Sequence, residues 1–172
     1  MKLDKSNIFR IAMWLIMVFG GAAISIYFDT VYFSSLLHSI GFHLISFVFG
    51  LILLRLVLKA AKNTGRYLAK MGREGDIPRL RTNKLVTDGL YGCMRHPMHF
   101  GLMFFFPAFA LLIGSPFFIM ILAPLEMIFM IVMIKLMEEP EAERKFGQAY
   151  REYKKQVPFF SIKKDCLKML LK

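Results

Sequence analysis

Charge is missing from three long stretches of this sequence. No Asp, Glu, Lys or Arg occurs in residues 11–28, 30–54 or 96–125, and 56% of all residues are hydrophobic. A helix needs about 20 predominantly apolar residues to cross a bilayer, and each stretch approaches or exceeds that length. Such runs exclude an ordinary soluble domain and predict an integral membrane protein.

Acidic residues are also scarce, because 12 Asp and Glu stand against 23 Lys and Arg, which gives a formal net charge of +11. In a soluble protein this balance would favour nucleic acid as a partner. Here the basic residues cluster near both termini and in 55–95, whereas 29–35 and 114–116 have none. By the positive-inside rule, the N-terminus, residues 59–97 and the C-terminal tail are cytoplasmic. We therefore expect membrane lipid, not nucleic acid, as the partner of these charges.

Cysteine is limited to Cys93 and Cys166, both on the predicted cytoplasmic side, where thiols stay reduced, so we expect no disulfide. Cys93 also begins a Cys-x2-His-x2-His spacing with His96 and His99. A structural metal site needs four converging ligands, and the other two histidines of the chain are predicted near the opposite membrane surface. We therefore expect no metal.

The apolar runs predict an all-α integral membrane protein with about four transmembrane helices in a single membrane domain, 1–172. The first two spans are expected over 8–28 and 33–58, and a cleavable signal peptide is the alternative for residues 1–28. Basic residues near the end of the second span share one face, where they can reach the headgroups: Arg55, Lys59, Lys62 and Arg66. The polar segment that follows, which contains Pro78, is expected to be part interfacial helix and part loop.

The last long run is expected to form a helical hairpin with both ends at the cytoplasmic face. Its first arm starts at Pro97, its second ends near Met137, and Gly114-Ser115-Pro116 between them is a turn signal. Pro140 suits the first turn of a new helix, because its missing N–H would have no partner there. That helix is expected to be cytoplasmic and amphipathic, and the tail 159–172 to be an interfacial anchor. Its apolar stripe comprises Ala142, Phe146, Ala149, Tyr150, Tyr153 and Val157.

Charged clusters mark both ends of this hairpin, Arg95-His96-Pro97 and Glu138-Glu139. A hairpin would bring them together at one membrane face. Pro97 places Arg95 and His96 at a helix N-terminus, which favours an anion, but the same residues also fit a simple positive-inside flank. The two acids fit either a ligand site or the first turn of the helix at Pro140.

Two further charged residues have open roles. Glu126 lies inside the fourth span, where it either serves a site or supports an interior kinked at Pro124. Lys135 lies about one turn before the acidic pair and is close enough to form a salt bridge with it.

Several motifs occur in a fixed order between residues 83 and 158. They are Asn83-Lys84-Leu85-Val86-Thr87-Asp88-Gly89-Leu90-Tyr91, Arg95-His96-Pro97-Met98-His99-Phe100-Gly101, Glu138-Glu139, Phe146-Gly147, Tyr150, Tyr153 and Val157-Pro158. In this order the chain resembles the membrane-embedded methyltransferases that include isoprenylcysteine carboxyl methyltransferases and phospholipid methyltransferase-like proteins. The resemblance covers about 83–158, the family-like catalytic core, whereas residues 1–80 match only in forming two spans.

The resemblance implies S-adenosylmethionine as the methyl donor and S-adenosylhomocysteine as the product. It also implies a lipophilic or small acceptor at the cytoplasmic face of the membrane. The family pattern and the helix-terminus argument together give the expected cofactor-binding residues: Lys84, Leu85, Val86, Tyr91, Arg95, His96, Pro97, Met98, His99 and Glu138. An amine acceptor must lose a proton first, so Glu139 or His99 is the candidate catalytic base.

Two departures from the family pattern bear on the acceptor. Position 99 is His where relatives usually have Tyr, and Ile134 stands where the carboxyl methyltransferases have a substrate-binding arginine. Lys135 beside it is the candidate substrate-binding residue. A prenylcysteine carboxylate is therefore not the expected acceptor, and an amine phospholipid, a small thiol or another lipophilic molecule stays open. The alternatives to a methyltransferase are a sterol-reductase-like oxidoreductase that uses NADPH and a non-catalytic membrane scaffold.

Overall fold

The computed structural model describes residues 5–77 and 82–172, and within these ranges all regular structure is helical, which confirms the all-α prediction. Three helices are long and apolar enough to cross a membrane: Ile8–Tyr32, Ile40–Met71 and Phe118–Phe146. A fourth apolar helix, Pro97–Ile113, is shorter. The protein is therefore an integral membrane protein, and the exact number of its spans stays a prediction.

Two compact units make up the described chain. The first unit comprises Met1–Leu54 and Phe105–Phe129, and the second comprises Arg55–Phe104 and Met130–Lys172. The chain passes between them within α4 (Ile40–Met71), between α6 and α7, and within α8 (Ala123–Met133).

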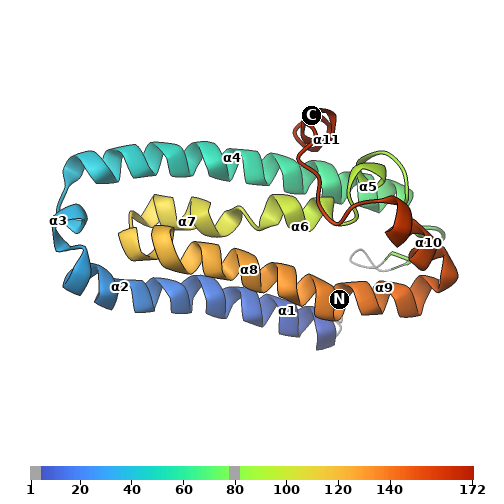
Figure 1. Ribbon diagram of the computed structural model, residues 1–172, viewed down its shortest axis with the longest axis horizontal. Helices are drawn as coiled ribbons and strands as arrows, with labels where there is room; N and C mark the ends of the chain where they lie inside the picture. Colours follow the sequence, from blue (N-terminus) through green and yellow to red (C-terminus); the bar gives the residue numbers. More distant parts are fainter. Residues whose placement is uncertain (1–4, 78–81) are drawn as a thin grey trace. The chain divides into compact units, whose positions relative to one another are not determined.

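The first unit begins with α1 (Lys5–Leu15), which continues through a π-helical turn, Ile16–Gly20, into α2 (Gly21–Tyr32). The short helix α3 (Ser34–Leu37) connects α2 to α4 (Figure 1). The expected second span, 33–58, was wrong at both ends, because α4 starts at Ile40 and continues to Met71. Its extra turns carry the basic residues at helical spacing, and no proline interrupts them. The predicted loop is correspondingly shorter, and Pro78 within it lies outside the described residues.

The turn between α7 (Phe105–Ile113) and the π-helical turn Phe118–Leu122 confirms the predicted hairpin turn. Gly114 has a φ of 65°, and a Cβ atom at this position would overlap the His43 ring. The buried carboxylate of Asp29, in the last turns of α2, accepts hydrogen bonds from the Ser115 hydroxyl and from the Phe117 N–H at 2.7 Å. Asp29, at the end of the first long helix, therefore caps the start of the helix Phe118–Phe146.

Glu126 lies within the first unit, on α8, and faces α2. A Cβ atom on Gly21 would lie 2.9 Å from Glu126 Oε1, so only glycine lets the acid pack this closely. The side chain is buried, and within the described part of the chain its Oε2 atom has no hydrogen-bond partner. A π-helical turn, Phe118–Leu122, precedes the nearby Pro124, as expected where a proline removes a helical hydrogen bond.

The second unit contains the end of α4, α5 (Leu90–Cys93), α6 (Pro97–Leu102), the π-helical turn Ile134–Glu138, and three later helices. These are α9 (Glu139–Phe146), α10 (Gln148–Gln156) and α11 (Lys164–Leu170). Here α6 packs closely on α4, because a Cβ atom on Gly101 would lie 2.8 Å from that of Ala60. The helix is interrupted after α6 by a turn at residues 103–104, because Pro107 has no N–H to donate to the Met103 carbonyl.

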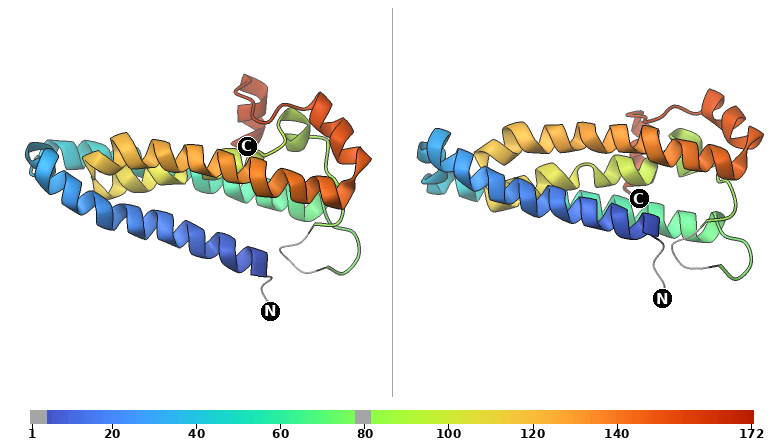
Figure 2. Two further views of the ribbon diagram at one scale, coloured as in Figure 1. Left: turned by 60° about the horizontal axis from the view of Figure 1, so that its bottom comes forward. Right: turned by 90° about the horizontal axis from the view of Figure 1, so that it is seen from below.

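Pro140 does not start a new helix, contrary to the expectation. The helix runs without a break from Phe118 to Phe146, and the π-helical turn Ile134–Glu138 directly precedes the proline. Pro140 has no N–H and cannot make the usual helical hydrogen bond, and this wider turn lets the helix continue without it. The chain instead changes direction at Gly147, with a φ of 55°, where α9 gives way to α10 (Figure 2). Glu138 and Glu139 therefore lie near the end of a long helix, not in the first turn of a new one.

A disulfide joins Cys93 of α5 to Cys166 of α11, with a Cα–Cα distance of 5.6 Å, so the expectation of two free thiols was wrong. The tail is not an interfacial anchor only, because α11 lies beside α5 (Figure 1). Leu170 is buried in a cluster with Ala60 and Leu90. This packing, between segments far apart in sequence, brings the two sulfur atoms together.

Candidate active site

The two charged clusters meet within the second unit, as the hairpin prediction required. Arg95 donates from Nε to Glu139 Oε1 at 3.0 Å, and its Nη2 atom lies 2.8 Å from the same oxygen. The His96 Nε2 atom lies 3.4 Å from that oxygen. A second pair joins His99 Nε2 to Glu138 Oε1 at 3.9 Å.

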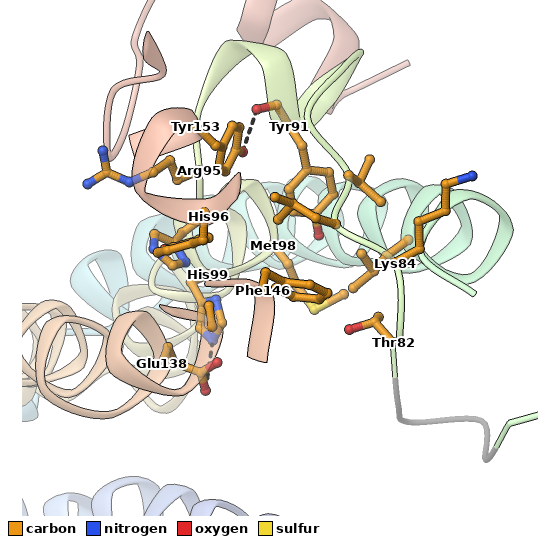
Figure 3. A pocket seen from close by; sticks show the side chains of 15 residues that line it. Thr82, Lys84, Tyr91, Arg95, His96, Met98, His99, Glu138, Phe146 and Tyr153 are labelled. Carbon is orange, nitrogen blue, oxygen red and sulfur yellow. Dashed lines mark hydrogen bonds and ion pairs between the residues drawn. The ribbon is translucent and has the colours of Figure 1, made fainter. Parts of the chain in front are cut away.

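Arg95 connects three elements at the start of α6. Its N–H donates to the Pro158 carbonyl at 2.9 Å, and its Nη1 atom donates to the carbonyls of Lys154 and Val157, at the end of α10. Cationic donors suit the carbonyl-rich C-terminus of a helix. In Figure 3 the guanidinium points away from the side chains that surround the pocket. The geometry therefore assigns most of the Arg95 donors to the protein itself, although its side chain borders the pocket.

Glu139 is the buried centre of this network, with 5% of its surface exposed. One carboxylate oxygen receives Arg95 and His96, and the other lies 2.9 Å from Lys154 Nζ of α10. Glu139 does not line the pocket described below, and both of its oxygens already have partners. Its position suits a residue that holds α10 against the start of α6.

A pocket lies within the second unit, next to this network (Figure 3). Its volume is about 180 Å³. Typical small-molecule pockets hold roughly 300–1,000 Å³, so a nucleoside-sized ligand would fill it and extend beyond its mouth. The lining residues are Leu68, Thr82, Lys84, Leu85, Val86, Tyr91, Arg95, His96, Met98, His99, Glu138, Ala142, Phe146, Tyr150 and Tyr153.

Nine of the ten expected cofactor-binding residues line this pocket, and Pro97, buried at the start of α6, does not. The expected substrate-binding residue, Lys135, is exposed, and its Nζ atom lies 5.6 Å from the centre of the Phe159 ring. Of the two candidate bases, His99 lines the pocket and Glu139 lies behind it. Among the described residues, no group of three His, Cys, Asp or Glu side chains could hold a metal ion.

One wall of the pocket comes from α9 and α10, with Ala142, Phe146, Tyr150 and Tyr153 in its lining. Tyr150, Tyr153 and Val157 form a buried cluster against Leu85, and the Tyr153 hydroxyl donates to the Tyr91 carbonyl at 2.6 Å. In the sequence these residues belong both to the predicted amphipathic stripe and to the family motifs. Leu68 and Thr82 carried no signal that could have placed them here.

Burial controls the protonation of the side chains around the pocket. Burial, together with the neighbouring His99, lowers the pKa of His96 to about 4, against the opposing effect of Glu139. His96 is therefore neutral at pH 7. Because its Nε2 atom faces the Glu139 carboxylate, that nitrogen carries the proton and Nδ1 is a hydrogen-bond acceptor. Burial also raises the pKa of Tyr150 to about 12 and raises that of Tyr91.

The Tyr150 hydroxyl is a candidate ligand contact. It is buried near the Glu139 carboxylate, whose charge further raises the Tyr150 pKa. Within the described part of the chain, however, its oxygen makes no hydrogen bond of ordinary geometry, and the nearby Glu139 oxygens already have other partners. A buried donor without a partner is costly, so an acceptor atom of a bound molecule would stabilise this arrangement.

Acidification should destabilise the protein through His96. Its pKa is about 4 in the folded state and about 6.5 in an unfolded chain, so the unfolded state binds more protons between these values. The stability that neutral His96 contributes is complete above pH 6.5 and is lost as the pH falls towards 4. Thermal unfolding of the wild type and of His96→Gln across this range measures the effect, and the variant should show the shallower pH dependence. Equal slopes would contradict the assignment, and His38→Gln, at an exposed histidine, is the control.

Comparison with known proteins agrees with this geometry. A family model described as phospholipid methyltransferase matches residues 37–149, about two thirds of the chain, including both charged clusters. No curated protein and no solved structure matches the chain. The match gives no support to a reductase or a scaffold. With its membrane-spanning helices, the chain therefore belongs to the phospholipid methyltransferase family and is a membrane methyltransferase.

Proposed function

We propose that the protein transfers a methyl group from S-adenosylmethionine to the headgroup amine of a phospholipid at the cytoplasmic face of the membrane. The observation that carries this proposal is the pocket of the second unit. Two motifs more than forty residues apart in sequence converge there, and aromatic, acidic and neutral imidazole groups line it together. The family description supports a phospholipid as acceptor.

The residues around the pocket fit the chemistry of the donor. Its ammonium group suits hydrogen-bond acceptors, and Glu138 and the Nδ1 atom of neutral His96 are such groups. Aromatic rings suit the adenine or the positively charged sulfur, and Tyr91 and Phe146 supply them. The Lys84 side chain lines the pocket and is proposed as the cationic partner of the donor carboxylate, because the Arg95 guanidinium already bonds to groups of the protein. Leu85, Val86 and Met98 complete the apolar surface.

When bound, S-adenosylmethionine supplies an electrophilic methyl carbon, whose bonding pair stays with sulfur as the acceptor nitrogen forms the new bond. The protein's contribution to such a displacement is mainly positioning and the exclusion of water. The Tyr153–Tyr91 hydrogen bond and the buried cluster on α10 cover the pocket on one side.

The distribution of charge supports the proposed side of the membrane. Basic residues flank the pocket-bearing segments, and the positive-inside rule supports a cytoplasmic location for this region and for both termini. Lys135, exposed one turn before Glu139, is proposed to meet the phosphate of the lipid headgroup.

Purified protein should be stabilised by S-adenosylhomocysteine and not by NADPH. A ligand at one hundred times its dissociation constant stabilises the folded state by about 2.7 kcal/mol, which thermal unfolding detects. His96→Ala and Glu138→Ala should each abolish the shift, because each removes an acceptor assigned to the donor ammonium group. His38→Ala and Glu152→Ala, at exposed positions, should keep it.

Each other outcome has a defined meaning. Stabilisation by NADPH instead would identify a reductase, and no shift with either ligand would favour a scaffold. Undiminished affinity in both pocket variants would refute the assignment of the pocket.

A further inference from the structure

The pocket contains two imidazoles in different environments. His96 is buried, neutral and committed through Nε2 to Glu139. His99, one turn later on α6, keeps 28% of its side chain exposed, and its Nε2 atom lies 3.9 Å from Glu138, which is 26% exposed. The two rings lie 5.9 Å apart in an edge-to-face arrangement. Only His99 therefore combines access to the pocket with a carboxylate that can stabilise a positive charge.

We propose that His99 is the catalytic base of this methyltransferase and that Glu138 stabilises the imidazolium that forms. The inference rests on the proposed function, because only an amine acceptor requires a base. At neutral pH the headgroup amine is an ammonium, and its nitrogen has no free electron pair. One N–H bond breaks, its electron pair stays on nitrogen, and the proton moves to the His99 ring. The neutral amine is then a nucleophile.

The alternative base, Glu139, does not have the required access. It is 5% exposed and lies outside the pocket lining. Arg95 and Lys154 both neutralise its charge, which reduces its tendency to take up a proton. The structure therefore separates the acidic pair into a positioning residue, Glu139, and a pocket residue, Glu138.

The residue type at position 99 agrees with this role. A phenol at this position, with an ordinary pKa near 10, would be a poor proton acceptor at neutral pH. An imidazole, with an ordinary pKa near 6.5, accepts and releases protons in this range. The other charged or titratable groups that line the pocket are Lys84, Tyr91, Arg95, His96, Tyr150 and Tyr153, in addition to Glu138. Of these, Glu138 is the acid paired with His99.

The proposal is tested with phosphatidylethanolamine in vesicles and S-adenosylmethionine labelled in the methyl group. His99→Tyr and His99→Ala should lower the rate at pH 7 by about 10²-fold or more, which is the usual contribution of a general base. The rate of both variants should recover as the pH rises, because hydroxide removes the proton instead. Added imidazole should restore His99→Ala at pH 7, since it occupies the space of the missing ring. His38→Tyr, the same change at an exposed histidine, should behave like the wild type.

A second measurement separates binding from proton transfer. The thermal shift with S-adenosylhomocysteine should fall far less than the rate in His99→Tyr, because the base acts on the acceptor even though its ring borders the donor pocket. An equal loss of rate at every pH, without rescue by imidazole, would overturn the proposal and assign His99 a structural role. An unchanged rate at pH 7 would also overturn it.

Failure of the proposed function is distinguishable from failure of this inference. If the wild type binds S-adenosylhomocysteine but does not methylate the amine lipid, the acceptor is wrong and no base is needed. If it binds neither donor nor product, the methyltransferase assignment of the pocket fails. If it methylates the lipid and the variants do too, only the role of His99 is refuted.

Discussion

Replacing Glu139 by glutamine should disrupt the second unit and abolish binding of the donor. The carboxylate is buried and lies between Arg95, whose side chain is 11% exposed, and Lys154, whose side chain is 41% exposed, so the variant leaves the buried guanidinium without its counter-charge. Removing one partner from a buried ion pair costs about 3–5 kcal/mol, far more than the loss of an exposed pair. Because these contacts hold α10 against α6, the Tyr153–Tyr91 wall of the pocket should loosen at the same time.

The same substitution at a half-exposed glutamate provides the control. Glu143 pairs with Arg151 on the surface at 2.9 Å, and Glu143→Gln should cost at most about 1 kcal/mol. Thermal unfolding and the shift with S-adenosylhomocysteine measure both variants. Combining Glu139→Gln with Arg95→Met should cost less than the sum of the two changes, because both remove one network. Similar small losses for Glu139→Gln and Glu143→Gln would show that the network contributes little.

Loss of the disulfide should produce the second large effect. Cys93 and Cys166 are separated by 73 residues, and a cross-link over a loop of that length stabilises the folded state by about 4 kcal/mol in the chain-entropy description. Cys93→Ser, Cys166→Ser and the double variant should all lose a similar amount, because each removes the same bond. Thermal unfolding with and without reductant tests this, since reductant should lower the unfolding temperature of the wild type alone.

Thiol labelling gives an independent measurement. Denatured wild-type protein should react with an alkylating reagent only after reduction, and a labelled pair without reductant would contradict the bond. Cys166 is 5% exposed, which protects it from soluble thiols on the side that the charge distribution predicts to be cytoplasmic. Slow reduction in the folded state, compared with the denatured state, is therefore expected.

Much of the architecture could be predicted because long uncharged runs and turn residues mark the helices of a membrane protein. The uncharged runs located the apolar helices, and the turn residues Gly114-Ser115-Pro116 located the hairpin turn. A hairpin with this turn places Arg95 and Glu139 at the same end, and the two side chains form an ion pair there. The effect of a single residue on the path of the backbone was harder to predict from the sequence. A π-helical turn before Pro140 lets the helix continue, and local sequence rules favour a new helix there.

The candidate site divides in the same way. Residues that belong to motifs, such as Tyr91 and Glu138, could be named from the sequence, and they line the pocket. The partners of Arg95 could not be named from the sequence. Two of them are backbone carbonyls at the end of α10, and every residue type has such a carbonyl. The disulfide was missed for a related reason. Its formation depends on how α11 packs on α5, whereas the prediction considered only the compartment.

The pairing of Asp29 with the distant hairpin turn also orders events during biosynthesis. The ribosome makes Asp29 long before its partners, which follow 86 and 88 residues later. The nascent first hairpin must therefore enter the bilayer with a carboxyl group that no protein atom yet satisfies, and this group should remain among the lipid headgroups. Synthesis of residues 115–117 then supplies the Ser115 hydroxyl and the Phe117 N–H. A chain truncated before residue 115 would lack both partners of this acid, so the last turns of α2 depend on a segment made much later.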